Sequence, residues 1–143
     1  MSENAEIQEI SSIQKQMAHE AFTKVPYLKL LGMELVDLKT GEAIVKLQMR
    51  DELRQPHGLL HGGATASVID TAMAFAVVTC LAENEKASTV DLTVHYLRPV
   101  TEGAIVCTAK IVKAGKRLLT VSAEVFNDEG KLIATALSTY AKI

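Results

Sequence analysis

The sequence contains no tryptophan, and aromatic residues make up only 4% of its 143 residues. It also lacks an excess of basic charge, because 15 lysines and arginines face 17 aspartates and glutamates, for a net charge of −2. Nucleic-acid binding depends on clustered cations that neutralise phosphates, and single-strand binding adds aromatic side chains on which bases stack. Both features are missing, so we expect no nucleic-acid partner.

Cysteine and metal-binding motifs are equally scarce. Cys80 and Cys107 are the only cysteines, both in apolar surroundings and outside any CxxC motif. His57 and His61 have no nearby cysteine to complete a zinc site. We therefore expect two buried free thiols in a reducing compartment, with no metal site and no cofactor.

A secretory leader and a long hydrophobic run are absent as well. The opening stretch MSENAEIQEISSIQKQ is polar and acidic, whereas a signal peptide needs a basic start and an apolar centre. No apolar run approaches the roughly 18–20 residues needed to span a bilayer. These absences predict a cytoplasmic protein without a membrane partner.

The length and the hydrophobic patterns that are present predict a single domain over residues 1–143. Apolar residues near helical spacing predict an N-terminal helix within residues 1–24, which ends before a proline. Residues 33–49 contain two alternating runs around a Lys-Thr-Gly-Glu turn and predict a hairpin. The charged stretch 51–60, with its proline and glycine, predicts a loop.

The second half of the chain predicts one long helix followed by a sheet. Residues 61–82 contain no proline and place alanine on nearly every side, which predicts a central helix that a sheet encloses closely. Strand-like runs follow at 87–97, 103–113, 117–127 and 131–142. The simplest solution is an α+β fold, an antiparallel sheet wrapped around one central helix with an extra N-terminal helix. The outer sheet face and the open strand edges predict a homodimer. We also expect two such dimers to pair, as a dimer of dimers.

The tripeptide His61-Gly62-Gly63 stands where the loop becomes the central helix. Glycines at a helix start allow another group to approach the backbone, and the first N–H groups there are unpaired and electropositive. Gly62 and Gly63 are therefore candidates to bind an anion or a carbonyl oxygen that acquires negative charge. The alternative is a tight turn that packs under the sheet.

Asp70 is the one acidic residue in the apolar central helix. An enclosed carboxylate costs several kcal/mol unless it is paired or faces a polar pocket. A structural carboxylate would bond to the backbone, to Ser67 or to Thr71. A functional one would serve as a nucleophile or a general base in a cavity.

The spacing of Gly62 and Asp70 constrains any shared reaction. Eight residues separate them on one helix, which corresponds to about 12 Å of rise. A carbonyl bonded to the Gly62 N–H would lie too far from Asp70 of the same chain for attack. If both act on one carbonyl, Asp70 comes from a second subunit whose central helix runs antiparallel, in a two-fold dimer with two equivalent sites.

These residues carry a resemblance to a known family. The segment QPHGLLHGG (residues 55–63), then Asp70, then TVDL (89–92) and YLRP (96–99) resemble the hotdog-fold acyl-CoA thioesterases of the PaaI-like, phenylacetate-pathway group. The resemblance runs from about residue 28 to the C-terminus. It implies a hotdog fold, an acyl-CoA substrate and hydrolysis of its thioester bond.

The resemblance also implies roles for individual residues. Gly62 matches the helix-start glycine whose N–H polarises the thioester carbonyl, and Asp70 matches the acid that attacks or activates water. Gln55 falls where the family carries Asn or Gln beside the thioester. His61 matches a histidine that shapes this pocket, and Thr89 matches a Ser or Thr that orients the attacking water.

The sequence departs from the family pattern in two ways. Some relatives carry a hydroxyl residue one helical turn after the acid, where this chain has Ala74, so that Thr89 would serve instead. Ser88 is the alternative if the preceding loop shifts by one residue. Members with Gln at the position of Gln55 often pair it with Glu rather than with an aspartate such as Asp70, which leaves aryl and aliphatic acyl groups both open.

CoA carries phosphates, so the resemblance also predicts cations near the substrate. Four basic residues at strand ends are candidates, although surface solubility explains them equally well: Arg98, Lys113, Lys116 and Arg117.

Three other functions compete with hydrolysis. A hydratase or dehydratase on the same fold uses a His and an acid near a proline-glycine loop, and the three prolines of this chain offer no such segment. A non-catalytic acyl-CoA sensor needs a DNA-binding segment, whereas the N-terminal helix is short, single and acidic. An inactive structural dimer would have no need of Asp70 and Gln55.

Overall fold

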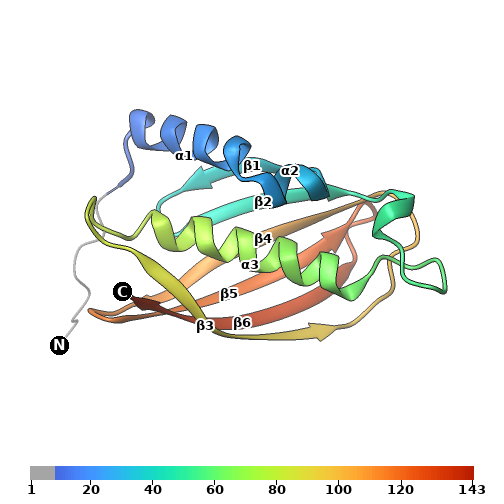
Figure 1. Ribbon diagram of the computed structural model, residues 1–143. Coiled ribbons are helices and arrows are strands. Elements are labelled where there is room, and N and C mark those ends of the chain that lie inside the picture. The colour runs from blue at the N-terminus through green and yellow to red at the C-terminus, as the bar shows by residue number, and fades with distance from the viewer. Residues whose placement is uncertain (1–8) are drawn as a thin grey trace.

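The computed structural model describes residues 9–143, and it confirms the predicted α+β hotdog architecture. A six-stranded antiparallel sheet, in the order β1-β2-β4-β5-β6-β3, curls around one long helix (Figure 1). The elements are α1 (Ser12–Lys24), α2 (Pro26–Leu31), β1 (Met33–Lys39), β2 (Glu42–Gln48), the 3₁₀ turn η1 (Asp51–Leu53), α3 (Gly62–Val78), β3 (Ala87–Tyr96), β4 (Ala104–Ala114), β5 (Leu118–Asn127) and β6 (Leu132–Lys142).

The N-terminal helix is shorter than predicted. Residues 1–8 of the expected helix lie outside the described residues, and α1 begins only at Ser12. Ser11 stops the helix there through a capping box, in which its hydroxyl accepts from the Gln14 N–H and the Gln14 side chain accepts from the Ser11 N–H. The helix ends before Pro26 as predicted, but this proline opens a second short helix, α2, that the sequence reading did not predict.

The central helix α3 spans Gly62–Val78 instead of residues 61–82. It ends early because the chain tightens into a 3₁₀-type turn, in which the Cys80 N–H bonds the Val77 carbonyl. The prediction that the helix is enclosed on every side is wrong for the single chain. Its sheet-facing side is buried, but Val78 is 52% exposed and Asp70 is only half-buried.

The remaining strands agree with the predicted runs to within one residue. The predicted hairpin forms between β1 and β2, with Lys39 opposite Glu42 at the turn. Strand β3 is an edge strand that pairs only with β6, and Val90 on it is 61% exposed. An edge strand leaves one row of backbone groups free to pair with another chain.

The outer face of the sheet carries both polar and apolar side chains. Residues that alternate with the buried ones on the central strands are Thr108, Lys110, Ser122, Glu124 and Thr135. Apolar side chains on the same face are also exposed, with Leu118 of β5 at 55% and Leu137 of β6 at 54%. On the helix side, Ile13 and Met17 of α1 are 70% and 62% exposed.

Candidate active site

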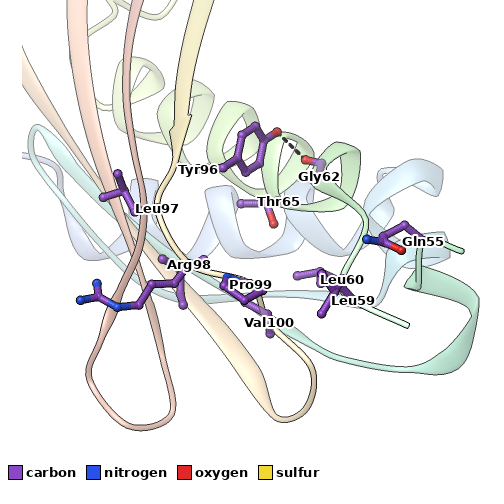
Figure 2. A pocket seen from close by; sticks show the side chains of 11 residues that line it. Gln55, Leu59, Leu60, Gly62, Thr65, Tyr96, Leu97, Arg98, Pro99 and Val100 are labelled. Carbon is purple, nitrogen blue, oxygen red and sulfur yellow. Dashed lines mark hydrogen bonds between the residues drawn. The ribbon is translucent and has the colours of Figure 1, made fainter. Parts of the chain in front are cut away.

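A cavity of about 310 Å³ lies at the start of α3. One wall is the loop before α3, and the other is the end of β3 with the segment that follows it (Figure 2). The lining residues are Gln55, Leu59, Leu60, Gly62, Thr65, Tyr96, Leu97, Arg98, Pro99, Val100 and Ile133. Gln55, Gly62 and Arg98 are the predicted site residues among them.

The backbone N–H groups of Gly62 and Gly63 have different roles, one at the cavity and one in a hydrogen bond within the fold. His61 is the N-cap of α3, and its Nδ1 accepts a hydrogen bond of 2.8 Å from the Gly63 N–H. The Gly63 donor is therefore already used. Within residues 9–143, no group accepts from the Gly62 N–H, so this donor stands free at the positive end of a 17-residue helix.

Gln55 presents a second free donor to the same cavity. Its side-chain oxygen accepts from the His57 backbone N–H, and its backbone N–H donates to the Leu59 carbonyl at 2.7 Å. The bond from His57 orients the side-chain amide, whose nitrogen is turned toward the cavity (Figure 2). No acceptor for this nitrogen is found in the described part of the chain.

Tyr96 forms a side of the cavity that the sequence reading missed. Its hydroxyl donates to the Gly62 carbonyl at 2.6 Å (Figure 2). A methyl group on Gly62 would meet the Tyr96 ring at 3.4 Å, which is ordinary van der Waals contact. Tyr96 belongs to the YLRP segment that carries the family resemblance, but no role was predicted for it. A further signal was its place at the end of a strand, where an amphipathic ring finds a polar partner.

Arg54 ties the two walls of the cavity together. Its guanidinium donates to the Gly58 carbonyl at 2.6 Å on one wall, and to the Thr101 carbonyl at 2.8 Å on the other. It also pairs with Asp51 at 2.9 Å and Glu102 at 3.0 Å. The Asp51 hydrogen bond, and then that of Glu102, hold the pKa of Arg54 above its usual value. Arg54 thus fixes the loop that carries Gln55.

Asp70 belongs to a second group of polar residues, further along α3 and outside the cavity lining. Its Oδ1 accepts from the Thr89 hydroxyl at 3.0 Å and from the Tyr140 hydroxyl at 2.8 Å. Tyr140 also lies 3.0 Å from the Asp70 carbonyl oxygen. Over residues 9–143, no side chain or backbone group donates to the other carboxylate oxygen, Oδ2.

The sheet explains why these two hydroxyls meet at one oxygen. Thr89 on β3 and Tyr140 on β6 are direct partners in the strand pairing, and both face α3. Thr89 and Tyr96 are seven positions apart, so a regular strand would turn them to opposite faces. The pairing shifts between Thr89 and Asp91, as in a β-bulge, and this shift brings both side chains to α3. Ser88, the neighbour of Thr89, is turned to the opposite face of the strand and is exposed.

Tyr140 was not among the predicted site residues. It is 2% exposed, and burial raises the pKa of its phenol well above the usual value, with the Asp70 carboxylate adding to the shift. The phenol is therefore a hydrogen-bond donor at neutral pH. The available signal was a tyrosine at a core-facing strand position, because a buried tyrosine hydroxyl needs a partner.

The predicted phosphate-binding cations do not gather at one place. Arg98 lines the cavity, but its guanidinium points away from Gly62 (Figure 2) and donates to the Leu132 carbonyl at 2.8 Å. Lys113, Lys116 and Arg117 lie at the turn between β4 and β5, at the opposite end of the molecule from the start of α3 (Figure 1).

Two further observations on residues 9–143 concern metal binding and membrane-spanning helices. No cluster of three or more His, Cys, Asp or Glu side chains is arranged to hold a metal ion. None of the helices in this range has the length and apolar character needed to cross a bilayer.

Comparison with known proteins gives consistent likenesses. A family model described as the thioesterase superfamily matches residues 57–134. This range includes Gly62, Asp70 and Thr89 but neither Gln55 nor Tyr140. Human acyl-coenzyme A thioesterase 13 is 33% identical over 124 residues, which cover 84% of this chain and 88% of that protein.

Solved structures agree with the sequence comparisons. A conserved protein from Pseudomonas aeruginosa superposes with a TM-score of 0.80 at 34% identity, covering 83% of this chain and 94% of that one. The Escherichia coli PaaI protein from the phenylacetic acid degradation operon gives a TM-score of 0.83 at 26% identity, covering 90% of this chain and 91% of that one.

Proposed function

Because the chain belongs to the thioesterase superfamily, in its PaaI-like hotdog group, we propose that it hydrolyses acyl-CoA thioesters to a free acid and CoA. The observation that carries the proposal is the pair of free donors at one cavity, the Gly62 N–H and the Gln55 amide. Such a pair suits an oxygen that becomes negative during acyl transfer. The relative named acyl-coenzyme A thioesterase 13 supports the same reaction.

The first step is attack on the thioester carbonyl. The Gly62 N–H, at the positive end of α3, binds the carbonyl oxygen and stabilises the charge that develops on it, with about 2.7–4 kcal/mol for one good donor. Gln55 adds a second hydrogen bond. His61 contributes indirectly, because it caps the helix and leaves the Gly62 N–H free.

Asp70 supplies the attacking group. Its carboxylate either attacks the carbonyl carbon or removes a proton from the attacking water, and Thr89 helps to orient that water. In either route a C–O bond forms, the C–S bond breaks, and CoA leaves as a thiolate that takes up a proton. Attack by water gives the free acid directly, whereas attack by Asp70 gives a mixed anhydride that a water molecule then hydrolyses, which releases the acid and restores the carboxylate. This leaving group is good because a thiol has a pKa near 8–9.

The active site is composite and lies at a two-fold dimer interface. The free donors and Asp70 are separated by about 12 Å of helix within one chain, and Asp70 does not line the cavity. Strand β3 has a free edge and touches α3 at both places, through Tyr96 at Gly62 and through Thr89 at Asp70. A two-fold axis midway between Thr89 and Tyr96 would bring the partner's Asp70 beside Gly62.

This arrangement also accounts for the scattered cations. The same axis would carry the partner's β4–β5 turn, with Lys116 and Arg117, toward the cavity end of this chain. We propose that these residues, together with Arg98 and with Gly63 and Ser88 near the substrate, contribute to CoA binding. The whole of residues 1–143 forms one domain in this proposal, and two dimers pair into a tetramer.

The direct test is a thiol-release assay with CoA thioesters from acetyl to palmitoyl, including phenylacetyl and hydroxybenzoyl. We expect turnover that varies with the acyl group, and the best substrate identifies an aryl or an aliphatic role. Absence of turnover across the panel, with tight binding of the same esters measured by calorimetry, would contradict hydrolysis and favour an acyl-CoA sensor.

The composite site predicts complementation between two inactive variants. Asp70→Asn and Gly62→Ala chains carrying different affinity tags are expected to be inactive alone. Their heterodimer contains one site with both native residues, so the purified heterodimer should have about half of the activity of the wild-type dimer. Because a site built within one chain would be damaged in both subunits, a heterodimer without activity would contradict the composite site.

A further inference from the structure

Tyr140 has one polar role in the structure, and that role is directed at Asp70. Its hydroxyl lies 2.8 Å from Oδ1 and 3.0 Å from the backbone carbonyl of Asp70. The side chain is 2% exposed and does not line the cavity at the start of α3. Because Tyr140 is almost completely buried and its hydroxyl bonds Asp70, its effect on the chemistry is expected to pass through Asp70.

The tyrosine oxygen is not required by packing. The residues of β6 that alternate in step with Tyr140, namely Ala134, Ala136 and Ser138, are small. A phenylalanine ring would fill the same volume as Tyr140 and would avoid burying a hydroxyl. Burial of a hydroxyl is unfavourable unless it is hydrogen-bonded, and among residues 9–143 the two acceptors to which this hydroxyl donates both belong to Asp70.

The two donors to Asp70 differ in their surroundings. Thr89 is exposed on the edge strand, where its hydroxyl can exchange the carboxylate for water. Tyr140 is held by the core and faces Thr89 directly across the strand pairing. Two donors on Oδ1 restrict rotation of the carboxylate and leave Oδ2 as its free oxygen.

We propose that Tyr140 is a positioning residue that holds the Asp70 carboxylate by Oδ1, so that Oδ2 is the oxygen that attacks or accepts the proton. The inference rests on the proposed hydrolase function. Placement of a reacting group matters strongly, since a displacement of about 1 Å can lower a rate by roughly 10²-fold.

The test is Tyr140→Phe, which removes one oxygen and keeps the ring. We expect kcat to fall about 10- to 100-fold, with KM within about twofold of the wild-type value because substrate contacts are unchanged. The matched control is Tyr27→Phe, which deletes a hydroxyl that also bonds α3, through Ser67 at 2.6 Å. Tyr27 is 52% exposed and outside the cavity lining, so its loss should leave kcat unchanged.

A double-mutant cycle with Thr89→Val separates positioning from a general loss of stability. Because Thr89 and Tyr140 bind the same oxygen, their effects on kcat should be strongly non-additive. All variants are assayed below their unfolding transitions, which are measured by circular dichroism, so a lower melting temperature does not obscure the result.

Two outcomes would overturn the role of Tyr140: a Tyr140→Phe enzyme with normal kcat, or additive effects in the cycle. Neither would affect the hydrolase proposal, which depends on turnover by the wild-type protein and its loss in Asp70→Asn. Conversely, a wild-type protein without turnover would remove the proposed function itself.

Discussion

Replacement of Asp70 by asparagine is expected to lower kcat by roughly 10²–10⁴-fold, the usual contribution of a positioned base. The fold should remain intact, because an asparagine oxygen can still accept from the Thr89 and Tyr140 hydroxyls that now bind Oδ1. Only the negative charge and the basicity of the second oxygen are lost. Thiol release from the best substrate of the panel measures the first effect, and thermal unfolding measures the second.

A matched control for this change is Asp37→Asn. Asp37 lies on β1 and forms a surface ion pair with Lys15 at 2.9 Å. Loss of an exposed pair changes stability by at most about 1 kcal/mol, so activity should be unaffected. An Asp70→Asn enzyme as active as this control would contradict the catalytic role of Asp70 and favour a structural carboxylate.

Replacement of Gly62 by alanine is the second large effect that we expect. The new methyl group would lie 3.4 Å from the Tyr96 ring, a normal contact, and the backbone of Gly62 is helical, so stability should change little. The methyl group also stands beside the free N–H, where it displaces the thioester carbonyl. Misplacement on this scale lowers the rate by roughly 10²-fold.

Gly63→Ala gives the contrasting result. Its methyl group would lie 2.9 Å from the His61 Nδ1, so it disturbs the hydrogen bond that caps α3. Loss of a helix cap costs about 0.5–2 kcal/mol, and this variant should therefore lose stability. Melting temperature and kcat/KM measured on both variants separate the two roles. Equal loss of stability in Gly62→Ala would instead favour a glycine needed only for packing.

Much of the fold follows from short-range patterns that the sequence displays directly. Alternating residues predicted the strands of the second half to within one residue, and the His-Gly-Gly segment predicted the start of α3. Helix ends were predicted less well. Ser11 and Gln14 form a capping box that shortens α1, and the 3₁₀-type turn after Val78 shortens α3.

The residues of the candidate site also differ in how far the sequence indicated them. The sequence was sufficient to single out Gly62 and Asp70, since a glycine at a helix start and a carboxylate in an apolar helix are unusual on local grounds alone. Gln55 was indicated only by the family resemblance. It predicted no role for Tyr96, which appeared only within the YLRP segment of the resemblance, and it did not indicate Tyr140. Both act through hydrogen bonds to residues at least 34 positions away, and no local pattern encodes such a contact.

The sequence by itself therefore determined the order of the strands and the central helix, the capped start of α3 and the isolated Asp70, because these depend on neighbours along the chain. Only the tertiary structure decided which hydroxyls reach Asp70. That choice depends on the pairing of Thr89 with Tyr140 and on the shifted register that follows Thr89. A shift of one residue turns every side chain of a strand to the other face, so the register of two distant strands fixes this part of the site.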